Sequence, residues 1–400
     1  MSSTRAKRAL GTCCAAHTLH DGLSDLTYVL LPLFAQTFGL SLAQVGMIRA
    51  AHRTAMASFQ LPAGLLAERI GERNLLAAGT AIAGLAFIAL GFASGFWMLL
   101  VALFFAGVGS AVQHPLCSTI ISHAYPESGR RAALGTYNLF GDVGKFAFGG
   151  ILSLCLMLSL PWQGPVIAYG IGAVVISGFI FAWIVNSRSV HDHTPQAGSH
   201  SATATASRGW GIRHRKGFAA LCAIEILDSS TRVGFLTLVA FLMMHKGLPE
   251  GWATLSVPLI LVGGMAGKYF CGLLAERVGI IRTIIITEVF TGAGIFLIAW
   301  LPSWGAFLLL PLLGVVLQGT SSVLYATIGD LVHADRLPRA FGLFYTLGSI
   351  CGIAAPLGYG LAGDLVGVQT AVLMMGLAVL LVIPLCAVLR PTISTAPAQI

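Results

Sequence analysis

Long apolar runs dominate the chain, and they limit its fold more than any other feature. The stretches LLAAGTAIAGLAFIALGFASGF and TAVLMMGLAVLLVIPLCAVL each hold about 20 uncharged, mostly apolar residues, which is enough for a helix to cross a bilayer. Only 10% of the residues are charged, against about a quarter in soluble proteins. A chain of 400 such residues cannot bury its apolar surface around a soluble core. We therefore expect an all-α polytopic membrane protein whose surface contacts the lipid bilayer.

Twelve transmembrane helices are predicted from the apolar runs and the polar or Gly/Pro positions between them. A polar stretch lies between the sixth and seventh runs, and it is rich in Ser, Thr, Gly and His. This composition predicts a linker over 187–215. This linker divides the chain into a six-helix bundle over 1–186 and a second one over 216–400. The predicted spans cover residues 9–36, 42–67, 74–93, 97–123, 131–158, 165–186, 216–244, 251–275, 281–301, 305–333, 339–363 and 368–389.

The distribution of Lys and Arg predicts the orientation. Outside the spans, Lys246 is the only basic residue on the side opposite the N-terminus, and all the others lie on the N-terminal side. The positive-inside rule then places both termini and the linker in the cytoplasm, with the chain in the cell (inner) membrane. Because topology accounts for the net charge of +8, no nucleic-acid partner is expected.

Neither a metal centre nor a cofactor is expected. The eight Cys residues show no CxxC spacing, so neither a zinc site nor a disulfide framework is indicated. The sequence contains no phosphate-binding loop or kinase signature, which argues against ATP. It also shows no convincing nucleophile–base set, so no enzymatic activity is expected. A metal pathway through His17, His20 and Asp21 is the alternative to this interpretation.

The two halves of the chain repeat each other. Residues 64–71 read GLLAERIG and residues 272–279 read GLLAERVG, 208 positions apart. A shift of about the same size places Asp21 on Asp228. Because each half has an even number of spans, both halves enter the membrane in the same direction. The sequence therefore predicts a parallel repeat about an axis along the membrane normal.

With these features the chain resembles the major facilitator superfamily over nearly its whole length. The repeated phrase follows the second and eighth spans, and it is similar to the family's loop signature G-x-L-A-D-R-x-G-R-K. Two positions depart from the signature, because Glu68 replaces the aspartate and Glu72 replaces a basic residue. The resemblance implies two pseudo-symmetric six-helix bundles with substrate held near the midplane between them. We expect a monomer.

The resemblance also implies a gating role for the repeated loops. Glu68 and Arg69 would pair with a helix end of the opposite bundle and latch the cytoplasmic side closed. Glu276 and Arg277 would do the same from the other half. The glycines are expected to permit close helix approach and a short turn. The candidate gating residues are Gly64, Glu68, Arg69, Gly71, Arg73, Gly272, Glu276 and Arg277.

Two further phrases are similar to the fosmidomycin-resistance branch of that family. These are GSAVQHPLCSTI in the fourth span and HTLHDGLSDLTYVLLPLF in the first. This likeness implies efflux. Two departures leave drug–proton exchange open: Leu103 stands where many proton-coupled members carry arginine, and Lys145 follows Gly144 where antiporters carry proline.

Polar and charged residues inside the predicted spans indicate the candidate site. A charged residue near the bilayer centre costs about 2.5–3.5 kcal/mol, so it needs a partner, a wet cavity or a function. Helical rise places Asp21, Arg53 and Asp228 at similar depth near the midplane. One acid, Glu288, falls in a span that the family places at the periphery. The candidates for substrate binding and proton coupling are His17, His20, Asp21, Asp25, Arg49, His52, Arg53, His114, Asp142, Lys145, Glu225, Asp228, Arg232 and Lys268.

Several of these groups also have a purely structural interpretation. Asp142 with Lys145, and Asp228 with Arg232, are spaced to pair within their own helices. His114, which precedes a proline, could satisfy backbone groups freed at the proline break.

The remaining candidates allow a choice of role. The three other histidines, His17, His20 and His52, could carry protons or act as neutral hydrogen-bonding groups. Asp21 and Arg53 lack an oppositely charged neighbour one turn away and could pair with each other across the first two spans.

The expected function is secondary active transport of a small polar, anionic or amphipathic solute by alternating access, with proton-coupled efflux as the leading form. Proton binding at Asp21 or Asp228 would release a cationic partner, Arg53 or Arg232, which could then hold an anion. Proton-coupled uptake of a metabolite is the alternative within this class. A transport-inactive membrane sensor is the alternative from another class, although the chain has no sizeable soluble domain through which to signal.

Overall fold

The computed structural model describes residues 3–125, 127–185, 211–333 and 336–393 of the chain. This part is built almost entirely of α-helices, as the apolar runs predict. The helices are α1 (Ser3–Phe38), α2 (Leu42–Ile70), α3 (Glu72–Gly91), α4 (Phe96–Ala111), α5 (Gln113–Ala124), α6 (Glu127–Met157), α7 (Gln163–Val185), α8 (Arg215–His245), α9 (Glu250–Val278), α10 (Ile280–Trp300), α11 (Ser303–Leu331), α12 (Leu337–Val366), α13 (Val368–Leu380) and α14 (Val382–Ile393).

Two of the predicted spans consist of two helices each. The fourth is divided into α4 and α5, and the twelfth into α13 and α14. A proline ring clashes with the carbonyl four residues earlier and removes one helical hydrogen bond. Pro115 lies four residues after Ala111, where α4 ends, and Pro384 lies four residues after Leu380, where α13 ends. Proline therefore accounts for the position of both breaks, but it is not sufficient for a break, since α9 and α11 stay continuous at Pro258 and Pro311.

Ten helical segments in the described part of the chain are long and apolar enough to cross a membrane. The two long helices outside this set are α1 and α2. Both carry several of the intramembrane charges, for example Asp21 and Arg53, and these lower their mean hydropathy. Several polar residues of both helices are buried in the fold, for example Asp21 and Arg49.

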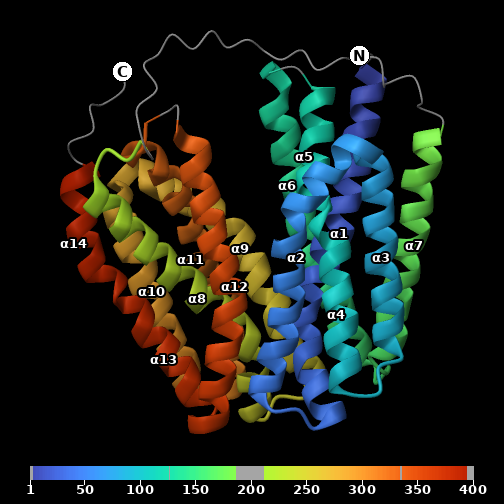
Figure 1. Cartoon of the computed structure of the whole chain (residues 1–400). Coiled ribbons are helices and arrows are strands. Elements are labelled where there is room, and N and C mark those ends of the chain that lie inside the picture. Colours follow the sequence, from blue (N-terminus) through green and yellow to red (C-terminus); the bar gives the residue numbers. More distant parts are fainter. Residues whose placement is uncertain (1–2, 126, 186–210, 334–335, 394–400) are drawn as a thin grey trace, which may run out of the picture.

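The helices pack as two groups, α1–α7 and α8–α14, which lie side by side (Figure 1). The main contacts between the groups are α2 with α12 and α6 with α9. The predicted linker over 187–215 falls largely outside the described residues, so the domain boundaries stay a prediction. Small residues allow close packing within each group. For example, a Cβ at Gly263 of α9 would collide with the Pro311 carbonyl of α11.

The two groups are joined at one end of the molecule. In Figure 1 they approach each other at the end away from the start of α1, and they diverge toward the end where α1 begins and α14 ends, which we call the terminal side. At the joined end, Asp364 of α12 accepts hydrogen bonds of 2.8 Å from the backbone N–H groups of Leu42 and Ala43 in α2. Gly46 and Gly360 allow the same two helices to approach closely, since a Cβ at either would collide with backbone of the other.

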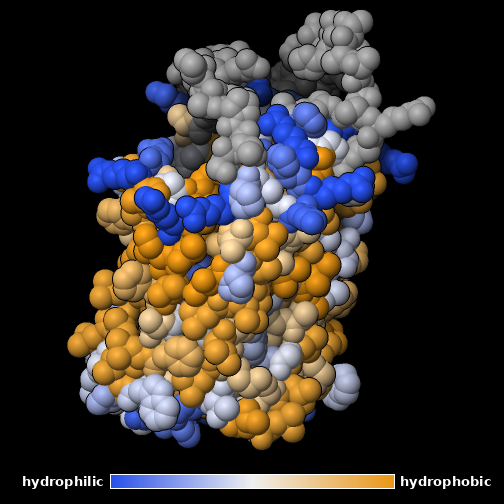
Figure 2. Space-filling view, turned by 90° about the vertical axis from the view of Figure 1, so that its left-hand side faces the viewer, coloured by the Kyte–Doolittle hydropathy of each residue, from blue (hydrophilic) through white to orange (hydrophobic). Residues whose placement is uncertain are grey.

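The surface supports the membrane assignment. Figure 2 shows a broad hydrophobic belt, with hydrophilic residues gathered above it toward the terminal side. Large apolar side chains such as Leu308 and Phe179 are strongly exposed, at 74% and 72%. Contiguous apolar surface of this extent is characteristic of contact with lipid.

Lys246, the single basic residue predicted on the far side, caps a helix. Its Nζ donates hydrogen bonds of 2.8 Å to the carbonyls of Ala299 and Leu301 at the end of α10. A cation at a helix C-terminus satisfies free carbonyls and interacts favourably with the helix dipole. Capping therefore accounts for the one exception in the charge pattern.

The repeated loop phrase forms two equivalent turns. Gly71 joins α2 to α3 with φ of 86°, and Gly279 joins α9 to α10 with φ of 90°. This left-handed conformation favours glycine, which explains the last letter of both copies. The first glycines differ from expectation. Nothing lies within 4 Å of a Cβ placed at Gly64 or Gly272, so these two positions do not mediate close helix packing.

Candidate functional site

A cavity of about 270 Å³ lies between the two groups of helices. Its wall comes from α1, α2 and α6 on one side and from α8, α9, α11 and α12 on the other. Seven of the predicted site residues line it, and they are all of its charged residues: Asp25, Arg53, Asp142, Lys145, Glu225, Arg232 and Lys268. The other seven candidates stand outside this lining.

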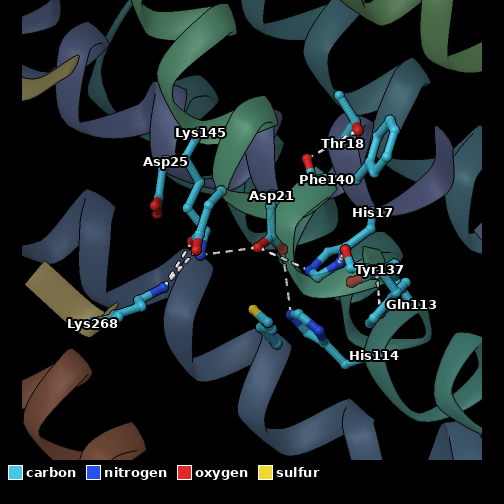
Figure 3. A network of polar contacts seen from close by, with 12 residues as sticks. His17, Thr18, Asp21, Asp25, Gln113, His114, Tyr137, Phe140, Lys145 and Lys268 are labelled. Carbon is cyan, nitrogen blue, oxygen red and sulfur yellow. Dashed lines mark hydrogen bonds and ion pairs between the residues drawn. The ribbon is translucent and has the colours of Figure 1, made fainter. Parts of the chain in front are cut away.

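Asp21 is the centre of a polar network behind the cavity wall (Figure 3). Its carboxylate is nearly buried and lies 3.1 Å from Lys145 Nζ, 3.1 Å from His17 Nε2 and 3.4 Å from His114 Nε2. The prediction that Asp21 pairs with Arg53 was wrong, because Lys145 occupies that role. The sequence could not reveal this pairing, since it depends on how closely α6 approaches α1.

Glycine permits that approach. A Cβ at Gly144 of α6 would collide with the backbone carbonyl of Thr18 in α1, and a Cβ at Gly22 of α1 would collide with the side chain of Phe148. With both positions empty of side chain, Lys145 reaches Asp21 across the contact. This explains how a lysine is accommodated where the family's antiporters carry proline.

A second pairing connects the two helix groups. Lys268 Nζ of α9 lies 2.9 and 2.8 Å from the two carboxylate oxygens of Asp142 in α6. The predicted pair within α6 is also present, with Lys145 Nζ 3.2 Å from Asp142 Oδ1. Asp142 thus binds two ammonium groups. One indication of this pairing was present in the sequence: Lys268 has no acidic residue one turn away in its own helix. An acidic partner would therefore have to come from another helix.

His17 lies between a backbone carbonyl and the Asp21 carboxylate. His17 Nδ1 lies 2.8 Å from the carbonyl oxygen of Tyr137, so Nδ1 must carry hydrogen and donate it. In a neutral ring the other nitrogen, Nε2, would then present a lone pair. Nε2 faces Asp21 Oδ2 at 3.1 Å, and two acceptors do not attract each other. The position of Nε2 beside this carboxylate keeps His17 among the candidate proton carriers.

His20 makes contacts that suit a neutral ring. Thr80 donates its hydroxyl hydrogen to the Leu76 carbonyl at 2.8 Å, so the His20 Nε2 at 2.9 Å from this hydroxyl must donate to it. The His20 Nδ1 is then free to accept from Ser110, 3.4 Å away. These contacts favour the structural alternative for His20.

Arg49 and His52 are fully buried against α1. Arg49 Nη1 donates to Thr27 Oγ1 at 2.7 Å, and the guanidinium lies 3.9 Å from the centre of the Tyr28 ring. His52 Nδ1 is 3.4 Å from Arg49 Nη1 and therefore accepts. Asp25 completes the group, 3.7 Å from Arg49 Nη2. These contacts position α1 against α2 behind the cavity.

Arg53 is a cation of the cavity wall that forms no ion pair within the described residues. In the described part of the chain no carboxylate lies within 4.0 Å of its guanidinium. Its polar contacts are the Tyr28 side chain and a long one of 4.0 Å to Met56 Sδ. Its Nε is buried and finds no hydrogen-bond partner in the part of the chain that the structure describes. This arrangement leaves a guanidinium free to bind an anion.

In the second half, the predicted pair of Asp228 and Arg232 is confirmed at 3.7 Å. Arg232 also contacts Ser229 Oγ at 3.3 Å and lines the cavity. Glu225, one turn before Asp228, also lines the cavity, yet among the described residues neither of its carboxylate oxygens has a hydrogen-bond partner. The positive and negative groups of the cavity are therefore not fully matched in pairs.

Three ligand-type atoms of His17, Asp21 and His114 lie within 4.8 Å of one another. Two imidazoles and a carboxylate could hold a transition metal. However, the Lys145 ammonium is already 3.1 Å from the same carboxylate, and a second cation there would be repelled. The arrangement therefore does not favour a metal ion.

The candidate gating residues lie at the terminal side. Arg69, Glu276 and Arg277 are exposed, and within the described residues none of them forms an ion pair with the opposite helix group. The Glu68 side chain lies outside what the structure describes. Since the two groups diverge at this side (Figure 1), the expected latch belongs to a conformation in which they meet, and it stays a proposal.

Known proteins resemble this chain over most of its length. A family model for the Major Facilitator Superfamily matches residues 13–356, with a second match over residues 262–399. A probable sulfoacetate transporter, SauU of Cupriavidus necator, is 24% identical over 355 residues, covering 83% of this chain and 81% of its own. The 4-hydroxybenzoate transporter PcaK of Pseudomonas putida is 22% identical over 389 residues, covering 89% and 84%.

A solved structure shows the same fold. A bacterial homolog of the human lysosomal transporter Spinster, in an inward-facing and unoccupied conformation, aligns over 100% of both chains with a TM-score of 0.79 and 15% sequence identity. The family match covers well over half of the chain, and the relatives are small-solute transporters. The chain therefore belongs to the Major Facilitator Superfamily, and it is a membrane transporter of small solutes rather than an enzyme.

Proposed function

We propose that this protein carries a small organic anion, such as a carboxylate or sulfonate, together with a proton by alternating access. The observation that supports this most strongly is Arg53, a guanidinium in the cavity wall with no carboxylate within ion-pair distance among the described residues. Guanidinium groups bind carboxylates through two parallel hydrogen bonds. The cavity lining also holds four basic residues against three acidic ones, which favours an anionic solute.

The size of the cavity favours a small solute. At about 270 Å³ it falls just below the range of roughly 300–1,000 Å³ typical of sites for drug-sized ligands. Two of the relatives are named for sulfoacetate and 4-hydroxybenzoate, which are small organic acids. A compact anion of this class fits both the charge and the volume.

The Asp21 network suggests how a proton and an anion would bind together. Protonation of Asp21 removes the charge that holds Lys145. Lys145 lines the cavity, so its freed ammonium can bind the solute or strengthen its contact with Asp142. Because protonation of Asp21 makes Lys145 available to the anion, the proton and the anion would be bound and carried together. This order favours symport, and under an inward proton gradient symport is uptake.

Proton-coupled efflux is the second candidate function. The phrases in the first and fourth spans that resemble the fosmidomycin-resistance branch support it. Efflux by exchange requires the proton and the solute to compete for one group, whereas the Asp21 network lets them bind together.

We also propose that the protein lies in the inner membrane with both termini in the cytoplasm. The positive charges at the terminal side support this orientation.

Transport in inside-out vesicles with an acidified lumen separates these functions. Symport predicts that a preloaded carboxylate or sulfonate leaves the lumen with protons. Exchange predicts that external solute accumulates in the lumen. Vesicles carrying Arg53→Gln should lose anion transport, and those carrying Lys216→Gln, a surface change of the same charge, should keep it. If no member of an organic-anion panel moves in either direction, the proposal fails and a transport-inactive sensor becomes the better explanation.

A further inference from the structure

Three carboxyl groups lie together in the second helix group, outside the Asp21 network. Glu225 and Asp228 belong to α8, and Glu288 belongs to α10. Glu225 and Glu288 are fully buried, and Asp228 is 3% exposed. Glu288 is the acid that the sequence placed in a peripheral span, so neither cavity lining nor substrate contact explains its presence.

The side chains of Asp228 and Glu288 interact with each other although they come from different helices. Glu288 contacts the Asp228 carboxyl group and the Thr320 hydroxyl. Thr320 directs its hydroxyl hydrogen to the Val316 carbonyl at 3.2 Å, so it does not neutralise the acid. In the described part of the chain no donor forms a hydrogen bond with either oxygen of Glu288 or with Oδ2 of Asp228.

The groups around this pair do not supply enough positive charge. Arg232, 3.7 Å from Asp228 Oδ2, is the only cation facing the three acids among the described residues. The other titratable groups that face them are thiols and a phenol: Cys222 of α8, Cys271 of α9, Tyr325 of α11, Cys351 of α12 and Cys386 of α14. Two ionised carboxylates in contact, buried and with one guanidinium between them, would repel each other strongly.

We infer that Asp228 and Glu288 share a bound proton and form a second proton site, in the helix group opposite Asp21. A hydrogen on one carboxyl group, donated to an oxygen of the other, satisfies both groups without a further cation. Glu225 lies between this site and the cavity. It lines the cavity wall, and it precedes Asp228 by one helical turn, on the same face of α8. This site does not depend on which solute is carried.

Infrared spectroscopy of the purified full-length protein, without solute and at neutral pH, tests this directly. A protonated carboxyl group gives a carbonyl band that shifts in deuterated water, and isotope-labelled glutamate identifies a contribution from Glu288. We expect such a band in the unmodified protein and its loss in Glu288→Gln. Glu250→Gln, which removes an exposed carboxyl group at the start of α9, should leave it unchanged. A spectrum without the band, or a band that persists in Glu288→Gln, would overturn the inference.

Sodium addition to the unmodified protein distinguishes a proton from a metal cation. A proton site predicts the same band in sodium and in potassium salts. Loss of the band on adding sodium would show that a sodium ion takes the position, and the inference would fail.

The pH dependence of thermal stability gives a second measurement. If the folded protein holds this proton and the unfolded chain does not, stability must fall as pH rises. The fall should be smaller in Glu288→Gln, and equal slopes for the two proteins would contradict the shared proton. Neither measurement involves transport. A negative result for the shared proton would therefore not contradict the proposed anion symport, and a negative result for symport would not contradict the shared proton.

Discussion

Lys268 binds both carboxylate oxygens of Asp142, at 2.9 and 2.8 Å, and joins the two helix groups at the cavity. Asp142 is at the same time 3.2 Å from Lys145, which holds Asp21. A change of charge at Asp21 can therefore act, through Lys145 and Asp142, on a contact between the two groups. In alternating access the groups move against each other, so this contact stands where protonation and movement would be coupled.

Neutralising Lys268 should shift the balance between conformations modestly. Partly exposed ion pairs contribute about 0.2–1 kcal/mol, and the Lys268 side chain is 43% exposed. We expect Lys268→Gln to change the population ratio by at most about fivefold, measured from distances between spin labels on the two groups. Lys268→Arg should restore the original ratio. A ratio unaffected by Lys268→Gln would show that the bridge does not bias the conformation.

Removing the cap at the joined end should favour opening there. Asp364 accepts hydrogen bonds from two backbone N–H groups in the first turn of α2, and loss of such a cap costs about 0.5–2 kcal/mol. Asp364→Ala should raise the fraction of molecules open at this end by roughly 2- to 30-fold. Reaction of a cysteine introduced between α2 and α12 measures this, and Asp364→Asn, which can still accept, should stay close to the unmodified protein. Equal reactivity of the alanine variant would contradict a latching role.

Arg53 should set the affinity for the anion. Hydrogen bonds to charged groups contribute about 1.5–3 kcal/mol, so Arg53→Gln should raise the Kd for a transported carboxylate about 10- to 100-fold. Arg53→Lys should fall between the two, because an ammonium binds an anion without the paired geometry. Calorimetric titration measures the affinity, with Lys216→Gln as the control. An unchanged Kd in Arg53→Gln would move the anion site elsewhere.

Asp21 should be needed for coupling and not for exchange. Asp21→Asn removes the group that would take the proton while keeping a side chain of the same shape. We expect it to abolish accumulation driven by a pH gradient and to leave solute exchange across the membrane intact. Both are measured with labelled solute in the same vesicles. Accumulation at the unmodified rate in Asp21→Asn would exclude Asp21 as the coupling group.

The helices and much of the site could be predicted because they depend on local properties. Length and polarity of each run defined the spans, and prolines at 115 and 384 carried the signal for the two breaks. The pairs within one helix, such as Asp228 with Arg232, follow from the spacing of four residues. Pairs between helices have no such signal, which is why the bridge from Lys268 to Asp142 was missed.

The sequence by itself determined that the chain is a helical membrane protein with two related halves and with charged residues inside its helices. Hydrophobic length and charge position are properties of each segment, and they need no partner to act. Only the tertiary structure decided which charges of different helices neutralise each other. Because α1 and α6 are in close contact at Gly144, Asp21 pairs with Lys145. Arg53 then lines the cavity without a carboxylate within ion-pair distance among the described residues. The contact of Asp228 with Glu288 likewise depends on how α8 and α10 are placed, because the faces that meet are set by packing and not by spacing along the chain.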